Sequence, residues 1–198
     1  GPTASGKTAL AIRLATEYGG EIICADSRTI YKGMDIGTAK PTDAEQGVVK
    51  HWGLDLVEPG ERFTAADFKD YANKCIADIR KRGKVPFLVG GTGLYVDAVL
   101  YDYRFGDGYD SARRDSLLQM SIESLQNYCK KHNIQLPQNI SNKRYIVRAI
   151  EQNGINNSSN DVPITNSVVV GISTDAAILR TRIEHRSEQL FQDGVVEE

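Results

Sequence analysis

The sequence predicts an α/β fold in which a parallel sheet is flanked by helices and interrupted by a helical insertion. The first observation is a glycine-rich loop at residues 1–8 that leads directly into a helical pattern. The second is that short apolar runs, at 21–25 and 85–89, alternate with longer helical patterns, which favours a doubly wound parallel sheet. The third is a change after Leu100, where helical patterns follow one another without a strand between them.

The loop at residues 1–8, GPTASGKT, satisfies the pattern G-x-x-x-x-G-K-[ST]. Its glycines let successive backbone N–H groups point at one anion, the lysine adds a positive charge, and the threonine hydroxyl is the usual ligand for Mg²⁺. The following helix directs its positive N-terminal end at the same anion. We therefore expect a P-loop NTPase-like site for a di- or triphosphate, with Thr8 at the metal, formed by Gly1, Pro2, Thr3, Ala4, Ser5, Gly6, Lys7 and Thr8. The alternative is a Gly/Ser-rich turn that simply precedes a helix.

Apolar runs and helix-boundary residues place the other elements of the first 100 residues. EIICA at 21–25 and VPFLV at 85–89 predict buried parallel strands. A first helix is expected at 7–18. A second begins with a capping box at Thr64 and Asp67 and runs to about 81, and a third follows the GGTGLY turn at 90–95. The stretch YKGMDIGTAKP at 31–41 predicts a long loop, and long ordered loops in compact domains are more often functional than idle.

The second half of the sequence predicts the insertion and a return to the sheet. Helical patterns cover 113–132 and 142–153, and a polar stretch follows at 154–161. We expect three segments: a first part of the P-loop core at 1–100, a helical insertion at 101–165, and a second part of the core at 166–198. In this last part SVVVGI at 167–172 predicts another buried strand, and a final helix is expected at 175–193, stopped by Gly194.

Composition is that of an ordinary globular protein, with 198 residues, 40% of them hydrophobic and 25% charged. No apolar run approaches the ~20 residues that span a bilayer, and no signal-type segment is present, so a cytoplasmic location is expected. With a net charge of −2, a nucleic-acid partner would need a local basic patch. Cys24, Cys75 and Cys129 show no C-x-x-C spacing, which favours buried structural thiols. Since no strand precedes the loop, and the chain stops just after a helical pattern, both termini are expected to be truncated.

Several stretches together resemble one family, the tRNA dimethylallyltransferases, also called isopentenyl-tRNA transferases. The matching stretches are GPTASGKT, ADSRTIYKGMDIGTAKP, LVGGTGLY, RAIE, and RIEHR with GVVEE near the end. The resemblance implies that a dimethylallyl group passes from dimethylallyl diphosphate to N6 of an adenosine beside the anticodon of tRNA, at position 37, and that diphosphate is released. It implies Mg²⁺ as cofactor and the tRNA anticodon stem-loop and dimethylallyl diphosphate as partners. A monomer with no membrane partner is expected.

The same resemblance implies roles for three residues at the reacting centre. Asp26 would be the general base on N6, and its position after the strand at 21–25 places it at the edge where open α/β sheets bind ligands. Its alternatives are a magnesium ligand or a helix cap. The Thr92 hydroxyl would touch the target nucleotide, although GGTG alone indicates only a tight turn. Arg186, which shares a helix face with Arg182, would reach the diphosphate; the alternative is a solvated helix face.

Further residues match segments of the family that contact tRNA. They are Asp26, Ser27, Arg28, Thr29 and Thr92 near the expected catalytic edge, and Arg114, Lys143, Arg144 and Arg148 in the insertion. Phosphate contacts of this kind carry affinity rather than sequence choice. Tyr145 stands where family members usually carry an arginine, and the Ala176-Ala177 pair stands where an arginine is common, which puts individual tRNA contacts in doubt.

Three other functions compete with this interpretation. A prenyltransferase acting on free AMP would share the loop, but the basic helical insertion would be superfluous. A P-loop kinase for a small substrate would leave residues 26–41 unexplained, although the loop would accept the phosphates of ATP. A non-catalytic RNA-binding protein would have no use for Asp26 facing a diphosphate.

Overall fold

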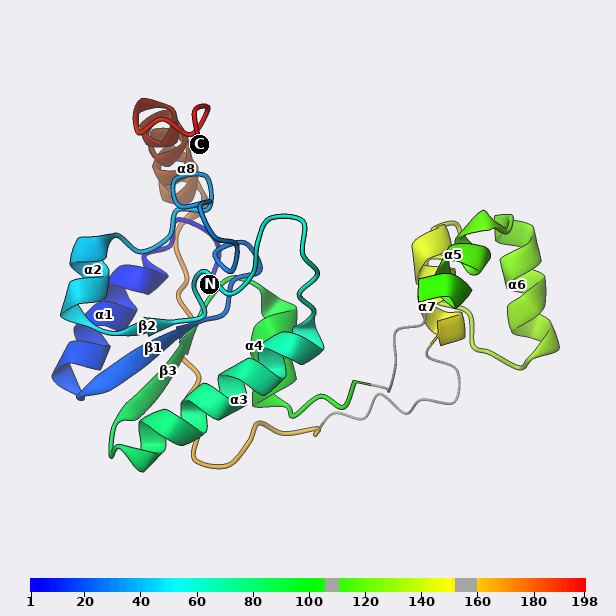
Figure 1. Ribbon diagram of the computed structural model, residues 1–198, viewed down its shortest axis with the longest axis horizontal. Coiled ribbons are helices and arrows are strands. Elements are labelled where there is room, and N and C mark those ends of the chain that lie inside the picture. The colour runs from blue at the N-terminus through cyan, green and yellow to red at the C-terminus, as the bar shows by residue number, and fades with distance from the viewer. Residues whose placement is uncertain (106–110, 152–159) are drawn as a thin grey trace. The chain divides into compact units, whose positions relative to one another are not determined.

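The computed structural model describes residues 1–105, 111–151 and 160–198, and divides into two units. The sheet unit consists of Gly1–Asp102 and Asn160–Glu198, and the helical unit is Tyr103–Ser159 (Figure 1). The helical unit lies within the insertion expected at 101–165. No helix in the described part of the chain is long and apolar enough to cross a membrane.

The sheet unit contains three parallel strands in the order β2-β1-β3, namely β1 (Gly20–Cys24), β2 (His51–Trp52) and β3 (Val85–Val89). In the central strand, Ile22 is paired with His51 on one side and with Phe87 on the other. This arrangement, with helices on both faces, confirms the predicted α/β fold. The described helices of this unit are α1 (Lys7–Glu17), α2 (Asp43–Val48), α3 (Ala65–Lys81), α4 (Gly93–Leu100) and α8 (Ala176–Gln192).

Alternation along β1 explains why helices cover both faces of the sheet. Ile23 and Ala25 pack in one core cluster with apolar residues of α3 and α4. Ile22 and Cys24 point to the opposite face and pack in a second cluster with Ala11 and Ala15 of α1. Figure 1 shows α3 and α4 on one side of the sheet and α1 on the other. Since both faces of β1 are buried, the continuous apolar run EIICA is the pattern expected of a central parallel strand.

The boundaries of α3 confirm the predicted capping box. The Asp67 backbone N–H donates to the Thr64 hydroxyl at 3.2 Å, and the Thr64 N–H donates to the Asp67 carboxylate at 2.8 Å. These contacts satisfy backbone donors that the first turn of a helix leaves without partners.

Two strand predictions were wrong in part or in full. β3 forms as a parallel strand but is only half-buried, because within the described residues no strand pairs along its side away from β1. Residues 167–172 form no strand at all, and Val168, Val169 and Val170 are 90%, 65% and 64% exposed. A β-branched run makes a strand only where a neighbouring strand accepts its backbone hydrogen bonds, and no described strand pairs with this segment.

The helical unit has a core of its own. Its helices are α5 (Ser111–Gln119), α6 (Ile122–Lys131) and α7 (Lys143–Glu151). The helical pattern expected over 113–132 forms two helices, and Ser121 caps the second, α6, by accepting a hydrogen bond from the Ser124 N–H at 3.1 Å. The helices enclose a buried apolar cluster: Leu117, Leu125, Cys129, Ile134, Ile146, Val147 and Ile150.

The chain leaves and re-enters the sheet unit at one place. The Asn160 N–H donates to the Tyr101 carbonyl, and the Ile164 N–H donates to the Leu100 carbonyl, each at 2.8 Å. The end of α4 and the segment that follows the helical unit are therefore held side by side.

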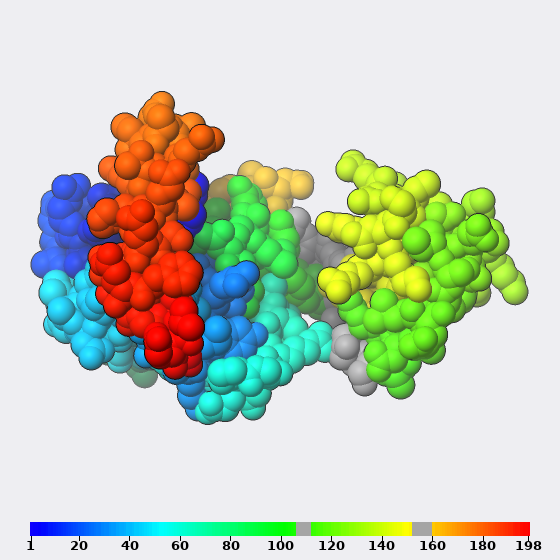
Figure 2. Space-filling model, turned by 90° about the horizontal axis from the view of Figure 1, so that it is seen from above, coloured from blue at the N-terminus to red at the C-terminus, as the bar shows by residue number. Residues whose placement is uncertain are grey.

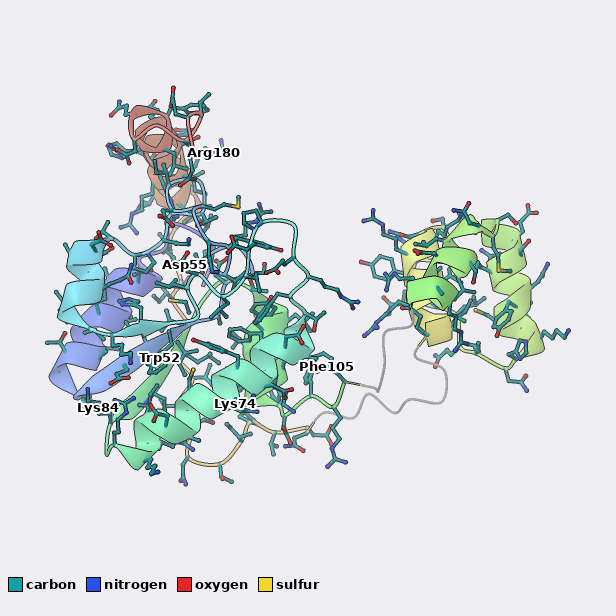
Figure 3. The ribbon with its side chains drawn as sticks, viewed as in Figure 1. Trp52, Asp55, Lys74, Lys84, Phe105 and Arg180 are labelled. Carbon is teal, nitrogen blue, oxygen red and sulfur yellow. The ribbon has the colours of Figure 1, made fainter. Side chains whose placement is uncertain are left out.

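A buried carboxylate holds the three strands together at the end of the sheet where β1 begins. Glu21 is 1% exposed and accepts hydrogen bonds from Arg82, from Lys84 Nζ at 2.8 Å and from Trp52 Nε1 at 2.8 Å. Trp52 belongs to β2 and Lys84 precedes β3, so they reach Glu21 from the two strands beside β1 (Figure 3). The hydrogen bond from Arg82 holds the pKa of the Glu21 carboxyl well below its ordinary value. The ionised form therefore stabilises the fold above the unfolded-state pKa, and this contribution is lost as pH falls through the folded value.

We expect Glu21→Ala to lower the free energy of unfolding by about 3 kcal/mol at neutral pH, at the low end for breaking a buried ion pair because Arg82 and Lys84 stay partly solvated. The deficit should shrink as pH is lowered below the carboxyl's ordinary pKa of 4.5. The matched control is Asp78→Ala, which removes an exposed partner of the same Arg82 and should cost less than about 1 kcal/mol. Urea denaturation at several pH values measures the free energy of unfolding of both variants. Equal losses of stability in the two variants would contradict the role assigned to Glu21.

Candidate active site

The phosphate-binding loop turns through two residues with positive φ, Ala4 at 56° and Gly6 at 85°. Gly6 is the N-cap of α1, and no side chain caps that end of the helix. The first N–H groups of α1 therefore remain available to an anion, as the sequence predicted for this loop. Gly1 approaches a neighbouring segment closely, because a Cβ there would lie 2.9 Å from the Ile172 carbonyl oxygen.

Lys7 folds back over the loop that precedes it. Its Nζ donates to the carbonyl oxygens of Gly1 at 2.9 Å and of Pro2 at 2.6 Å. Burial lowers the pKa of the Lys7 ammonium, Asp26 acts in the opposite direction, and Arg186 lowers the pKa further. Charges from two other parts of the chain therefore act on the Lys7 ammonium.

The second part of the site lies where β1 and β3 end. The Ala25 N–H donates to the Val89 carbonyl at 2.7 Å, and the Thr92 N–H donates to the Ala25 carbonyl at 3.2 Å. Asp26, the next residue, accepts a hydrogen bond from the Arg28 N–H at 2.9 Å through Oδ1, which fixes its carboxylate on a tight turn. The structure thus brings Asp26 and Thr92 to the same edge of the sheet, as predicted.

Thr92 occupies the N-cap of α4, but its side chain does not cap that helix. Its Oγ1 instead accepts a hydrogen bond from the Ser27 N–H at 3.0 Å and lies 3.3 Å from the Ser27 hydroxyl. The side chain that would ordinarily close the start of α4 therefore ties the two strand ends together, and the N–H groups of α4 receive no cap from it.

Gly90 allows this close approach of the two strand ends. A Cβ on Gly90 would lie 1.9 Å from the Ala25 carbonyl oxygen, which leaves no room for any other residue. A Cβ on Gly91 would meet only the Lys7 Nζ, at 3.9 Å. The phosphate-loop lysine therefore lies beside the GGTG turn that carries Thr92.

An open cleft of about 440 Å³ adjoins this edge. It is lined by Ser27, Arg28, Tyr31, Met34, Pro59, Gly60, Phe63 and Tyr95. Tyr95 is 4% exposed and its ring stacks on Phe68, with 4.2 Å between the centroids. Aromatic rings beside an arginine suit an unstacked nucleobase. Sequence reasoning missed this cleft, because its aromatic residues come from three distant segments. A slightly larger hollow of about 480 Å³ lies along α8 and contains none of the predicted site residues.

The two arginines of RIEHR differ in their surroundings. Both project from α8, which begins with Asp175 as its N-cap. Arg186 is partly buried and close enough to Lys7 to lower the lysine pKa, whereas Arg182 is exposed. Of the two arginines, Arg186 is therefore the one whose charge acts on Lys7, and its contact with a diphosphate stays a prediction.

The residues matched to tRNA-contacting segments have varied positions. Arg28 and Arg144 are exposed, but Thr29 is buried. In the helical unit, Arg114 and Arg148 lie 3.0 and 3.8 Å from the Glu151 carboxylate. Lys143 donates to the Leu118 carbonyl at 3.0 Å, so the basic face of α7 is formed by its arginines. Contacts of these residues with tRNA stay predictions.

Comparison with known proteins decides the family. A model described as IPP transferase matches residues 29–198. The chain belongs to this family. A model described as Isopentenyl transferase matches residues 1–56. Among curated IPP-transferase relatives, the tRNA dimethylallyltransferase of Bacillus pumilus is 39% identical over all of this chain and 67% of its own length. The same name is given to relatives from Oceanobacillus iheyensis and Anoxybacillus flavithermus, at 36% and 38% identity.

Solved structures agree with this membership. The full-length tRNA isopentenylpyrophosphate transferase from Bacillus halodurans is 36% identical, with a TM-score of 0.69 over all of this chain and 66% of its own. A Staphylococcus epidermidis member is 31% identical, with a TM-score of 0.65 over 98% of this chain and 68% of its own. The chain therefore spans about two thirds of the length of these bacterial transferases. A eukaryotic dimethylallyltransferase, 22% identical with a TM-score of 0.82, shares the fold.

We expect Gly90→Ala to destabilise the protein by more than about 3 kcal/mol, since backbone atoms of Ala25 cannot move away from the new methyl group. Gly91→Ala is the matched control, because its Cβ would meet only the flexible end of Lys7, and its effect should stay within about 1 kcal/mol. Chemical denaturation of the two variants measures the difference. Comparable stability of both would show that the strand ends are farther apart than described.

Proposed function

We propose that this protein transfers a dimethylallyl group from dimethylallyl diphosphate to N6 of an adenosine beside the anticodon of tRNA, at position 37, with release of diphosphate. The observation that carries the proposal is that Asp26 and Thr92 share one edge of the sheet, and that the turn carrying Thr92 lies beside Lys7 of the predicted diphosphate loop. Membership of the IPP transferase family, whose bacterial relatives carry this activity in their names, supports the same reaction.

The reaction needs one bond formed, one broken and one proton moved. The N6 nitrogen attacks the allylic carbon of the donor as the bond from that carbon to the diphosphate oxygen breaks. An exocyclic amine is a poor nucleophile because its lone pair is delocalised into the ring, so positioning and proton removal matter. Asp26 accepts the N6 proton, and its carboxylate is held in place by the Arg28 N–H.

The leaving diphosphate gathers negative charge, and the phosphate loop is suited to accept it. The uncapped N–H groups at the start of α1 and the ammonium of Lys7 would provide positive charge, and Arg186 from α8 would add to it. Ser5 adds a buried hydroxyl that has no hydrogen-bond partner in the described part of the chain.

The donor set of this loop also fits Mg²⁺. Thr8 is exposed at the first turn of α1, so its hydroxyl and the diphosphate oxygens together would hold the ion. When bound, Mg²⁺ would neutralise part of the charge on the leaving group.

The adenosine must leave its stack to reach Asp26. The cleft lined by Tyr31, Phe63 and Tyr95 adjoins that carboxylate and would receive an extruded nucleoside. Exposed arginines, Arg28 beside the cleft and Arg144 and Arg148 on the helical unit, would contact tRNA phosphates.

We expect Asp26→Asn to reduce prenyl transfer by about 10²–10⁴-fold, because the amide cannot take the N6 proton. The transfer is measured as the label that passes from dimethylallyl diphosphate to unmodified tRNA in the presence of Mg²⁺, with free AMP as a competing acceptor. Binding of inorganic diphosphate should be unchanged. Asp43→Asn, on the exposed first turn of α2, is the matched control. If the label appears in AMP rather than in tRNA, AMP takes the place of tRNA as the substrate. If ATP is consumed and no label is transferred, a reaction of ATP takes the place of prenyl transfer.

We expect Arg186→Ala to lower kcat by about 10²–10³-fold, the usual cost of removing a group that stabilises charge in the transition state. Arg182→Ala, one turn earlier and exposed, should change kcat little. Steady-state kinetics with the same labelled donor compare the two. A larger effect of Arg182→Ala would reverse the assignment of the pair.

A further inference from the structure

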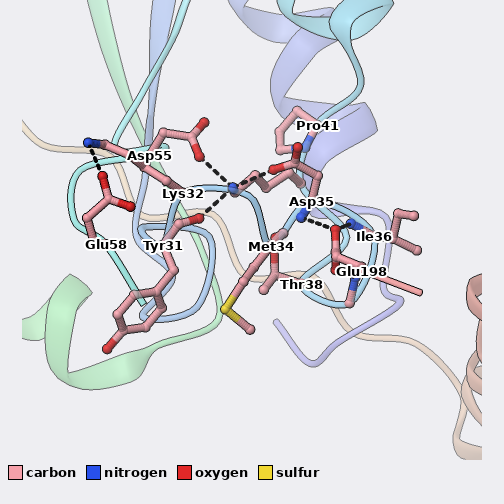
Figure 4. Close-up of polar contacts among 12 residues, drawn as sticks. Tyr31, Lys32, Met34, Asp35, Ile36, Thr38, Pro41, Asp55, Glu58 and Glu198 are labelled. Carbon is pink, nitrogen blue, oxygen red and sulfur yellow. Dashed lines mark hydrogen bonds and ion pairs between the residues drawn. The ribbon is translucent and has the colours of Figure 1, made fainter. Parts of the chain in front are cut away.

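Three consecutive backbone amides hold one carboxylate beyond α8. The N–H groups of Asp35 and Ile36 donate to Glu198 Oε1 at 2.5 and 2.7 Å, and the Gly37 N–H donates to Oε2 at 2.8 Å (Figure 4). Successive N–H groups that point at one anion form a nest, and hydrogen bonds to an ionised acceptor are among the stronger ones. The bonds to these amides hold the pKa of the Glu198 carboxyl below its ordinary value.

The donor side of this contact is fixed from within the loop at 31–41. The Lys40 side chain is 4% exposed, and its Nζ lies 2.6 Å from each of three oxygens: Asp35 Oδ1, Asp55 Oδ1 and the Tyr31 carbonyl (Figure 4). Asp55 lies outside this loop, and Lys40 ties the loop to it. The three N–H groups of the nest are therefore held in place without Glu198.

The acceptor side is fixed to α8. After the helix ends at Gln192, Gly194 turns the chain with φ at 94°. The Val195 N–H then donates to the Leu190 carbonyl at 3.0 Å, and the Glu198 N–H donates to the Gly194 carbonyl at 3.2 Å. Glu198 is therefore bound to the end of α8 and moves with it.

Among the described residues, α8 contributes no fully buried side chain, and Leu179, Arg186 and Leu190 are only partly buried. Figure 2 shows the helix standing out from the sheet unit, with its red C-terminal end against the blue surface of the loop. At this contact, a Cβ on Gly37 would lie 3.2 Å from both Glu198 Oε2 and Val195 Cγ2. The loop glycine thus allows the turn after α8 to approach its backbone.

We propose that Glu198 is a positioning residue whose carboxylate clamps the loop at 31–41 to α8 and thereby sets the place of Arg186 at the phosphate loop. The inference rests on the proposed function for the role of Arg186. Because no residue of α8 is fully buried in the described part of the chain, packing alone fixes this helix weakly, and the polar contact near its end adds a directional attachment. The clamp joins the helix to a loop that Lys40 holds to Asp55 in the sheet unit.

The test compares Glu198→Ala with Glu197→Ala, a neighbouring carboxylate outside the nest, in the intact protein. We expect Glu198→Ala to lower kcat for prenyl transfer and to raise KM for dimethylallyl diphosphate, with a combined loss of about 10–100-fold, as displacement of a catalytic group by 1 Å can cause. KM for tRNA should stay unchanged. Glu198→Gln should recover part of the loss, since its one carbonyl oxygen can still accept from the nest.

A double-mutant cycle shows whether the effect passes through Arg186. In the Arg186→Ala background, Glu198→Ala should change the rate by less than about twofold, since the group it positions is absent. If the two substitutions lower the rate independently, so that their fold-changes multiply, the proposal is overturned. A Glu198→Ala variant that transfers at the wild-type rate would overturn it as well.

Binding of inorganic diphosphate, measured by calorimetry, tests the clamp without requiring transfer. Glu198→Ala should weaken this binding in the wild-type background and not in Arg186→Ala. If the wild type transfers no dimethylallyl group, the proposed function is overturned. The clamp is then still tested by the binding of inorganic diphosphate. Gly37→Ala provides a second variant, since its methyl group would displace the turn while Glu198 is intact, and it should shift both readouts in the same direction. Unchanged binding in both variants would overturn the clamp.

Discussion

The contact on which the site depends is the approach of the β3 end to the β1 end, where Gly90 lies against the Ala25 carbonyl. Parallel strands carry their carboxyl ends to one edge, but their following turns usually diverge toward separate helices. Here backbone bonds from Ala25 to Val89 and from Thr92 to Ala25 keep the two turns together. Asp26 and Lys7 are neighbours because of this join, since each lies beside one of the joined segments.

The two ends of the sheet use charge in opposite ways. At the start of β1, Glu21 is surrounded by hydrogen-bond donors, and both of its carboxylate oxygens accept hydrogen bonds. At the other end, helix termini lack side-chain caps and a buried hydroxyl on Ser5 lacks a described partner. The first arrangement stabilises the fold, whereas the second leaves polar groups whose requirements a bound anion can meet. Stability and ligand binding are thus separated along the strand direction.

Sequence reasoning succeeded where the determining interactions are local. The phosphate loop, the capping box of α3 and the central strand each follow from residues a few positions apart. It failed where a distant partner decides the outcome. Residues 167–172 have the composition of a strand but no ladder partner among the described residues, and the aromatic cleft combines Tyr31, Phe63 and Tyr95. Glu198 belongs to the GVVEE stretch that resembles the family, but its contact could not be predicted, because a carboxylate after a helix looks the same in sequence whether or not a nest lies opposite.

The paired backbone contacts at the junction of the two units have a consequence for how such proteins change over time. Tyr101 and Leu100 are bonded to Asn160 and Ile164, so the chain departs and returns through a single closed neck. A longer segment inserted at such a neck raises the entropic cost of closing it only slowly, by about 0.6 kcal/mol for each doubling of its length. The helical unit also encloses its own core. Evolution can therefore lengthen, shorten or exchange this unit while the sheet unit is inherited intact.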